Sequence, residues 1–286
     1  MAILPMVLAA AYFAINWGLE IIHNIENQAN LVVNSMAERH VWSLEKAQVY
    51  ISEMNAKMDR DDPIQPEDCQ NLLNEYASIG GFVSIGVFKE NGEVICSVPS
   101  IINEDDRYDL VDVKAAVIGD QPYVGNVQID PISGKNIIPL IIALNTDSPA
   151  DFLIAGISLE AFQQGVSRAG IPADLELVFT DLNGAIIAIW PEQNNLLASQ
   201  DPTFSFWARQ IEISPQGKIT TGGIDDVQRF FAYRMLSFGN NDYGIIRSGL
   251  PLENVFLEIR RLIYTILVLL VNTFANYGDK TGCLTG

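Results

Sequence analysis

The chain contains the same hairpin pattern twice, and this repeat constrains its possible fold more than any other feature. Residues 87–99 read VFKENGEVICSVP, and residues 178–191 read VFTDLNGAIIAIWP. The two Asn-Gly pairs, at Asn91 and Asn183, lie about 92 residues apart. Asn-Gly between strand-like runs is the strongest local signal for a β-hairpin, because both residues tolerate the positive φ of its turn. The sequence therefore predicts two hairpins.

The repeat continues downstream at nearly the same offset. The run GKNIIPLIIAL at 134–144 precedes the strand-like run VQRFFAYRML at 227–236 by about 92 residues, and GISLE at 156–160 precedes GLPLE at 249–253 by about 93. A fixed offset over three segments predicts a duplicated module. The alternative is that the segments share only the generic composition of β-hairpins. The length of 286 residues is sufficient for two domains of about 100 residues each.

Composition argues against several classes of function. The formal charge of −18 lacks the basic footprint of nucleic-acid binding, so we expect no nucleic-acid partner. The two histidines, His23 and His40, precede both modules, which leaves the modules without a histidine-based catalytic triad. The three cysteines form no CxxC pair, which argues against a structural zinc site. We expect neither enzymatic activity nor a cofactor.

Both ends of the chain are apolar. Residues 2–19 carry no charge and are of minimal length for a membrane span, so we assign 1–19 to a transmembrane helix. A cleaved signal peptide is the alternative, although a basic n-region and a clear cleavage site are missing. Residues 262–271 form a shorter apolar run, and we interpret 259–286 as a partial second transmembrane helix and a tail.

Residues 20–60 are predicted to form a long stalk helix. Apolar or semi-apolar residues recur every three or four positions, as one helical face requires. We interpret His40, which lies on this stripe, as a packed surface histidine rather than a ligand. The members of the stripe are Ile25, Ala29, Val32, Met36, His40, Leu44, Ala47, Ile51, Met54 and Met58.

The remainder divides into two predicted modules, at 61–169 and 170–258. The first has a short helix at 67–79, the hairpin, strands near 123–130, 136–144 and 152–158, and a helix at 159–169. The second is predicted to lack an equally long insert after its hairpin.

This order of weak motifs resembles the double Cache sensor regions of bacterial transmembrane receptors, and most of all the subtype found on diguanylate cyclases and sensor histidine kinases. The resemblance covers roughly residues 20 to 258, and no single motif is diagnostic. The matching pieces are Cys69-x-x-Leu72, Val94-Ile-Cys-Ser97, Gly125 through Gly134-Lys135, Ile157-Ser-Leu-Glu-Ala-Phe162, Phe179-x-Asp181-x-Asn-Gly184 and Gly249-Leu-Pro251.

The resemblance implies an α+β fold: a long N-terminal helix with two tandem PAS-like antiparallel-sheet modules, flanked by membrane helices. It implies that the membrane-distal module (61–169) binds a small molecule and that the membrane-proximal module (170–258) often binds nothing. The expected protein is a homodimeric sensing region in the inner membrane, with its modules outside the cytoplasm, which relays binding to a cytoplasmic output domain. A membrane-anchored dimerisation module without a ligand is the alternative.

In such regions the ligand contacts come from the loop and helix after the first hairpin and from the facing strands. Arg107 can pair with a ligand carboxylate, and tyrosines give an apolar wall with a polar tip. Amino-acid-binding members carry an Arg-x-Trp-Tyr pattern and a strand-end Asp, whereas this chain has Arg107-Tyr108-Asp109 and Ser158. The ligand class therefore stays open. The predicted ligand-binding residues are Arg107, Tyr108, Asp109, Tyr123, Asp130 and Ser158.

Two further readings concern a metal and a disulfide. The acidic residues between 104 and 112 are a weak calcium alternative without EF-hand spacing, and we expect no metal. Cys69 and Cys96 lie 27 residues apart. If this region is outside the cytoplasm, the two can form a disulfide; the alternative is a pair of buried thiols.

Overall fold

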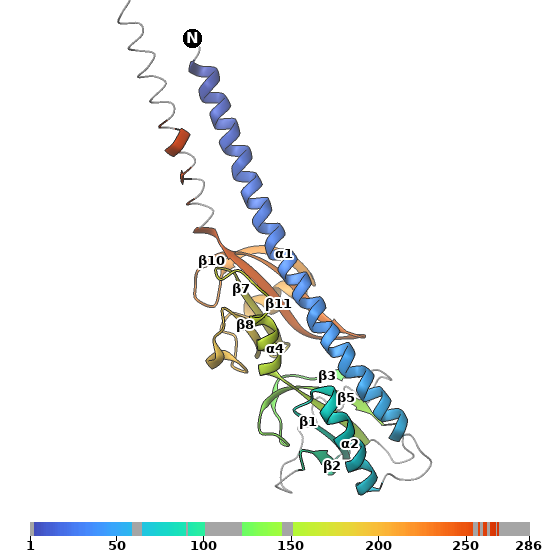
Figure 1. Ribbon diagram of the computed structural model, residues 1–286. Helices are drawn as coiled ribbons and strands as arrows, with labels where there is room; N and C mark the ends of the chain where they lie inside the picture. Colours follow the sequence, from blue (N-terminus) through green and yellow to red (C-terminus); the bar gives the residue numbers. More distant parts are fainter. Residues whose placement is uncertain are drawn as a thin grey trace, which may run out of the picture.

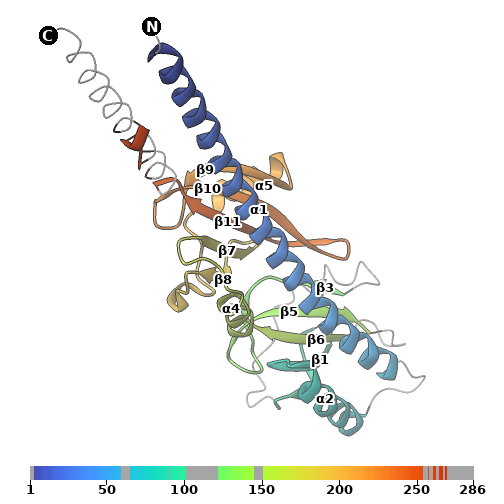
Figure 2. The same ribbon diagram turned by 45° about the horizontal axis from the view of Figure 1, so that its top comes forward.

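Two antiparallel sheets follow one another along a single long helix (Figure 1). The computed structural model describes residues 3–58, 65–89, 91–100, 122–144 and 151–253, with short pieces between 257 and 268. The helix is α1 (Ile3–Met58), which has 56 residues and packs against both sheets. At ~1.5 Å per residue it is about 84 Å long. Its N-terminal part projects beyond the second sheet, at the end of the molecule opposite the first sheet (Figure 2).

The stripe predicted on this helix is confirmed. Most of its members are buried against the sheets, whereas Ile25 and Val32 pack at the margin. Helix α1 is continuous across residue 20. Among the residues that the structure describes, no helix has the length and the apolar content needed to cross a bilayer. The predicted segment 259–286 lies almost wholly outside the described residues.

The first sheet, called sheet A, has the order β2-β1-β6-β5-β3, with β4 also paired to β5. Helix α2 (Pro66–Gly80) packs against β1 and β2, and α4 (Leu159–Ser167) leaves the end of β6. The strands are β1 (Ser84–Lys89), β2 (Val94–Val98), β3 (Tyr123–Val124), β4 (Gln128–Ile129), β5 (Asn136–Ala143) and β6 (Asp151–Ser158).

The second sheet, called sheet B, has the corresponding order β8-β7-β11-β10-β9. Between β8 and β9 the chain forms the short 3₁₀-helix η1 (Asn194–Leu196) and helix α5 (Phe204–Ile213). The strands are β7 (Glu176–Asp181), β8 (Ile186–Trp190), β9 (Gln216–Gly222), β10 (Gln228–Phe238) and β11 (Asn241–Pro251).

The structure confirms the duplication. The bounds of β1 and β2 recur in β7 and β8 at an offset of about 92 residues. The register of the first hairpin shifts between Val87 and Phe88, and that of the second shifts between Phe179 and Thr180, which are the equivalent positions. The glycines of the two Asn-Gly turns have φ of 82° and 88°. Shared composition alone does not place a register shift at equivalent positions in both copies.

The expectation that the second module lacks a long insert is wrong. The connection from β2 to β3 covers residues 99–122, and the connection from β8 to β9 covers residues 191–215. The two are nearly equal in length, and the second contains η1 and α5. Helix α5 was missed because its apolar residues Phe204, Trp207 and Ile211 lie in a short segment between polar loops.

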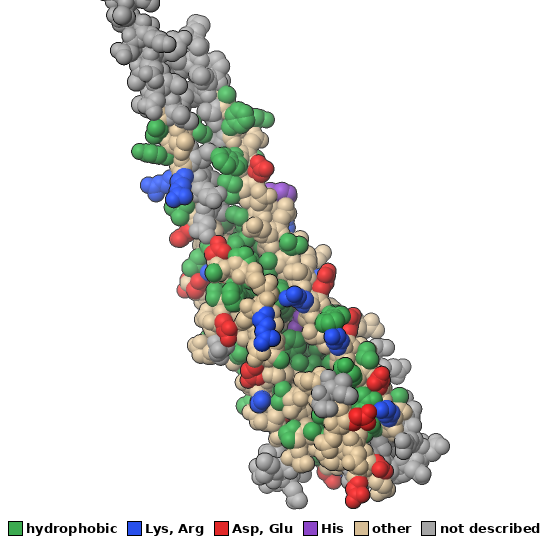
Figure 3. All heavy atoms as spheres, in the orientation of Figure 1, with side chains coloured by type: hydrophobic (Ala, Val, Ile, Leu, Met, Phe, Trp, Pro, Cys, Tyr) green, Lys and Arg blue, Asp and Glu red, His purple; other side chains and the backbone are tan. Residues whose placement is uncertain are grey.

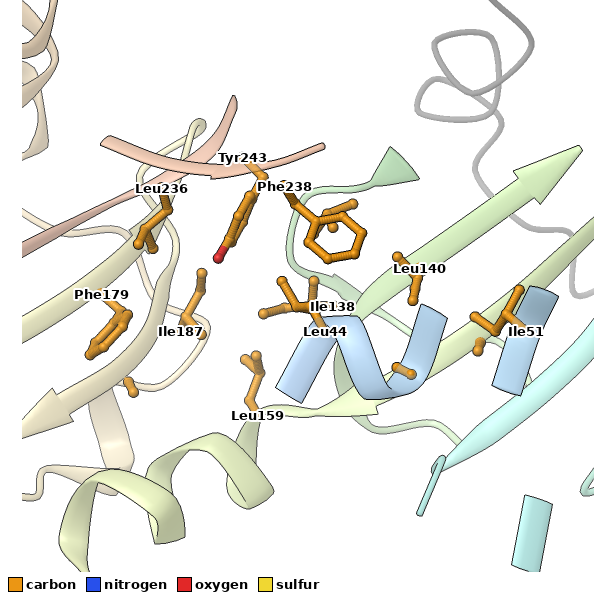
Figure 4. Packing of buried hydrophobic residues seen from close by; sticks show 14 of the residues in the cluster. Leu44, Ile51, Ile138, Leu140, Leu159, Phe179, Ile187, Leu236, Phe238 and Tyr243 are labelled. Carbon is orange, nitrogen blue, oxygen red and sulfur yellow. The ribbon is translucent and has the colours of Figure 1, made fainter. Parts of the chain in front are cut away.

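One hydrophobic core runs through both sheets along α1. Figure 4 shows Leu44 and Ile51 of α1 beside Ile138 and Leu140 of β5, with Tyr243 of β11 facing the same cluster. Phe179, Ile187, Leu236 and Phe238 of sheet B belong to this cluster as well. The core therefore joins the two sheets and the helix into one packed unit.

Candidate functional site

The strands of sheet A present different environments on their two faces. Alternate residues such as Ile85, Val87 and Leu140 belong to the core shared with α1 and α2. The residues between them point to the opposite side, which we call the second face of sheet A. A separate apolar cluster lies on this face, with buried Phe88, Ile137, Ile141, Phe152 and Ile154.

Strand register places one predicted site residue, Tyr123, on the second face. Cross-strand partners share a face, so the pairs Gly86–Ile154, Ile154–Ile141 and Ile141–Tyr123 define one row across the sheet. Tyr123 is half-buried and packs against the apolar cluster. Its ring therefore lies along this face.

Gly86 lies in this row of the second face, where neighbouring side chains occupy the space that a Cβ atom would take. A Cβ atom added to Gly86 would lie 2.8 Å from the ring of Phe88 and 3.2 Å from Cδ1 of Ile132. Real Cβ atoms essentially never come within 3.0 Å of other heavy atoms. A larger residue at position 86 would therefore displace the ring of Phe88 or the end of the Ile132 side chain.

Two unpaired polar atoms lie beside this apolar floor. Asp130 is fully buried, and its Oδ2 accepts hydrogen bonds from the backbone N–H (2.8 Å) and the hydroxyl of Ser133. Among the described residues, its Oδ1 has no partner. The same is true of Nε2 of Gln128, which is also buried. Gln128 and Asp130 are two positions apart on an extended segment, so both side chains point to the second face.

Buried polar atoms without a partner are rare, because each costs about 1–3 kcal/mol in lost hydration. Here an acceptor and a donor occur together, next to an apolar surface. Sequence reasoning selected Asp130 but missed Gln128. Gln128 could have been predicted because it is two positions from Asp130, and residues two apart on a strand lie on the same face.

Ser158 has a structural task at this edge of the sheet. It pairs with Ile137, which also pairs with Gln128, so Ser158 lies in the same row of the second face. Its hydroxyl accepts a 3.4 Å hydrogen bond from the N–H of Ala161 and donates to the carboxylate of Glu160. This is the N-cap of α4. The hydroxyl is thus already engaged with the helix.

Three of the six predicted ligand-binding residues, Tyr123, Asp130 and Ser158, therefore meet on one face. The other three, Arg107, Tyr108 and Asp109, lie outside the described residues. The acidic stretch between 104 and 112 lies there too. In the described part of the chain, no group of three His, Cys, Asp or Glu residues is placed to hold a metal ion.

The equivalent face of sheet B is filled by its own side chains. Val178 occupies the position of Gly86, and its partner Arg247 occupies that of Ile154. Arg247 is fully buried and forms a 2.6 Å ion pair with Asp201. Its guanidinium also donates to Oγ1 of Thr203 (3.1 Å) and lies 5.0 Å from the ring of Trp207 in α5. The arginine and α5 therefore occupy this surface.

A second set of ion pairs, centred on the buried Arg229, lies next to this face. Arg229 lies 3.0 Å from Glu176 and donates to Asp225 at 2.8 Å. Burial raises the pKa of Glu176, and the guanidiniums of Arg247 and Arg229 oppose this rise. The hydrogen bond from Arg229 lowers the pKa of the Asp225 carboxyl. Both carboxylates are therefore paired with Arg229. Among the described residues, the Nε atoms of Arg229 and Arg247 have no hydrogen-bond partner.

A disulfide fixes α2 to the edge of sheet A. Cys69 of α2 and Cys96 of β2 are joined, with their Cα atoms 6.1 Å apart. Beside it, the side-chain amide of Gln70 donates to the carbonyl of Ser97 at 2.8 Å. Of the two alternatives for these cysteines, the structure has the bridge.

The interpretation of His40 as a surface histidine is wrong. The side chain is only 5% exposed, and its ring packs against that of Phe162 at a centroid distance of 4.3 Å. Burial lowers the pKa of His40 to about 3, so the imidazole is neutral near pH 7. The histidine is part of the core because α4 and sheet B close over this side of α1.

Neither protein-family models nor curated protein sequences match the chain. Solved structures do match its fold. The extracellular domain of the putative histidine kinase rpHK1S-Z16 has a TM-score of 0.66 at 15% identity, covering 82% of this chain and 98% of that one. The ligand-binding domain of the Pseudomonas fluorescens chemoreceptor CtaA, in complex with L-isoleucine, has a TM-score of 0.63 at 15% identity, covering 84% and 97%.

The periplasmic sensory domain of the Campylobacter jejuni chemoreceptor Tlp1 is similar as well. Its TM-score is 0.64 at 10% identity, covering 82% of this chain and 98% of that one. All three matches extend over nearly the whole length of the sensor domains. The long helix and the two antiparallel sheets, which the sequence predicted, are therefore the fold that these solved sensor domains share.

Proposed function

We propose that the chain is the extracytoplasmic sensing region of a bacterial membrane receptor and that it binds a small molecule on the second face of sheet A. The observation that carries this proposal is the pair of unpaired buried atoms, Oδ1 of Asp130 and Nε2 of Gln128, beside an apolar floor. The counterpart face in sheet B differs in its carboxylate: Asp201 there is paired with Arg247, whose Nε is the atom left without a partner among the described residues.

The chemistry of the face favours a ligand with an amino group. Asp130 offers a carboxylate oxygen to an ammonium or another donor, Gln128 offers an N–H to a carboxylate or carbonyl, and the apolar cluster accepts an aliphatic or aromatic part. We propose Arg107, Tyr108 and Asp109 as further contacts. Among the similar structures, CtaA holds L-isoleucine and the Pseudomonas aeruginosa chemoreceptor PctC holds GABA. Amino acids and related amines are therefore the first ligand class to test.

We further propose that the region is anchored in the inner membrane through the N-terminal part of α1. Large hydrophobic side chains are exposed there, and a cluster of this kind requires a bilayer or another protein to cover it. The Cys69–Cys96 disulfide is consistent with a position outside the cytoplasm. The exposed residues are Tyr12, Phe13, Trp17, Leu19 and Ile22.

Transmission to an output domain would use α1. This helix packs against both sheets, so a shift of sheet A on ligand binding changes its contacts along their shared core. A ligand that binds one arrangement more tightly than the other moves the population toward it. In this proposal, α1 carries the change to the membrane.

A thermal-shift screen of the purified chain tests the proposal. The screen covers the common amino acids, GABA, small amines and amine-free carboxylates. We expect stabilisation by at least one amine-bearing compound, because a ligand that binds only the folded state raises its melting temperature. The response should be lost in Asp130→Asn and kept in Asp242→Asn, a matched change at an exposed carboxylate. Stabilisation by no compound, or an equal response in Asp130→Asn, would contradict the proposal.

The second candidate is a membrane-anchored dimerisation module without a ligand. It is favoured by the exposed hydrophobic residues on α1, which continue past the N-terminal part to Leu31 and Trp42. Sedimentation of the chain in detergent measures the dimer, and the ligand screen decides between the two candidates. A stable dimer that responds to no compound would favour the second.

A further inference from the structure

A groove lies between α1 and α4 and is closed at its base by β7 and β8 of sheet B. Its volume is about 300 Å³, at the lower end of the range for small-molecule sites. The groove is separate from the second face of sheet A, since its walls come from Met36 and His40 on α1, Phe162 and Val166 on α4, and Phe179 on β7. It is predominantly apolar.

The floor contains a buried polar atom without a partner. Nε2 of His40 makes no hydrogen bond in the described part of the chain, although the side chain is only 5% exposed. The aromatic rings of Phe162, Phe179 and Tyr243 surround the imidazole at centroid distances of 4.3, 5.5 and 5.6 Å. The groove therefore combines an aromatic floor with one unused hydrogen-bonding position.

Among the described residues that line the groove, the one charged side chain is that of Arg39. Arg39 forms no salt bridge with any described residue, and Trp42 beside it is 56% exposed. Nζ of Lys46 lies 3.8 Å from the ring of Trp42. Figure 3 shows hydrophobic side chains between Lys and Arg side chains on this part of the surface. The positive charge at this groove is opposite in sign to the net charge of −18 of the whole chain, and it is complementary to an anion.

We propose that this groove is a second binding site, for a small aromatic or aliphatic molecule with an anionic group. The apolar part lies on the floor between α1 and α4, and the anionic group lies at Arg39. A bound molecule bridges α1 and α4, the helix that connects the two sheets. The site does not depend on the ligand proposed for sheet A, because it shares no residue with that face.

Two fluorescent probes with the same ring system test the site on the full chain. Anilinonaphthalene sulfonate carries an anionic group, and phenylnaphthylamine does not. The blocking variant is Gly165→Leu, because Gly165 lines the groove and a Cβ there meets no atom within 4 Å. Leucine also favours a helix over glycine, so this variant should fold. The control is Gln164→Leu, which adds the same side chain at the neighbouring exposed position outside the groove.

We expect Gly165→Leu to remove a saturable component of the binding of both probes, with affinity falling by about tenfold or more, whereas Gln164→Leu leaves it unchanged. Arg39→Gln should weaken the sulfonate by about threefold and leave phenylnaphthylamine unchanged, as a partly screened surface charge predicts. Equal binding by the wild type and Gly165→Leu would overturn the site. An equal effect of Arg39→Gln on both probes would overturn the assignment of an anionic ligand.

Discussion

The carboxylate of Asp181 accepts a hydrogen bond from the backbone N–H of Val127 at 2.8 Å. Asp181 ends β7 of sheet B, and Val127 directly precedes β4, the strand that carries Gln128. The other carboxylate oxygen accepts from the N–H groups of Asn183 (3.0 Å) and Ala185 (2.7 Å) in the second Asn-Gly turn. One buried side chain therefore ties the hairpin of sheet B to the segment that forms the candidate site.

Replacement of Asp181 should loosen this connection. Asp181→Ala leaves several backbone N–H groups without their acceptor, and we expect a loss of about 1–3 kcal/mol in the free energy of unfolding. Denaturant titration measures the loss, and hydrogen exchange should show faster exchange of the Val127 amide. Asp242→Ala removes an exposed carboxylate from the same sheet and serves as the control. Unchanged exchange at Val127 in Asp181→Ala would show that the contact does not hold the segment.

The buried His40 predicts a loss of stability in mild acid. The folded state holds its pKa at about 3, below the ordinary value of 6.5, so the unfolded chain binds a proton first as pH falls. The stability due to the neutral imidazole is present above pH 6.5 and is lost as pH falls below it. Between pH 6.5 and 5 the wild type should lose about 2 kcal/mol relative to His40→Phe.

Denaturant titrations of both proteins across this pH range measure the difference. The variant His23→Phe retains His40 and should show the same fall as the wild type. A difference between the wild type and His40→Phe that does not depend on pH would mean that His40 is accessible to protons in the folded state.

Loss of the disulfide should destabilise the chain. The bridge closes a loop with a sequence separation of 27, and the unfolded chain gains freedom when it is removed. We expect the Cys69→Ser, Cys96→Ser double variant to lose about 2–4 kcal/mol. Addition of a reductant should lower the melting temperature of the wild type to that of the variant and leave the variant unchanged. A wild type that does not respond to the reductant would contradict a bridge that contributes to stability.

The ion pair inside sheet B should be costly to break. Arg247→Met leaves the buried carboxylate of Asp201 without its charge partner, and we expect a loss of about 3–5 kcal/mol. Arg168→Met, which removes an exposed arginine, is the matched control and should cost less than about 0.5 kcal/mol. A small effect of Arg247→Met in denaturant titrations would indicate that water reaches this face and that sheet B is not filled as described.

The parts of the fold that were predicted rest on local patterns. Each Asn-Gly turn requires positive φ at its glycine, so the turn and the strands beside it can be recognised within a few residues. The buried stripe on α1 follows from its period of about 3.6, because one helical face meets both sheets. The fixed offset between the copies then predicted a duplicated module.

The parts that were missed depend on contacts between distant residues. Asp181 and Val127 are 54 positions apart, and no local pattern links them. The burial of His40 follows from α4 and β11 closing over α1, whereas its residue type suggested the surface. Gln128 could have been found from its spacing to Asp130. That its amide nitrogen has no partner became visible only when the neighbouring strands were in place.

Calorimetric titration with the strongest amine-bearing compound from the thermal-shift screen tests the central claim most directly. For the wild-type chain and Asp242→Asn we predict one site per chain with equal affinity. For Asp130→Asn we predict an affinity at least about tenfold weaker, because a hydrogen bond to a charged group contributes about 1.5–3 kcal/mol. Equal affinity in Asp130→Asn and the wild type would contradict a ligand site on the second face of sheet A.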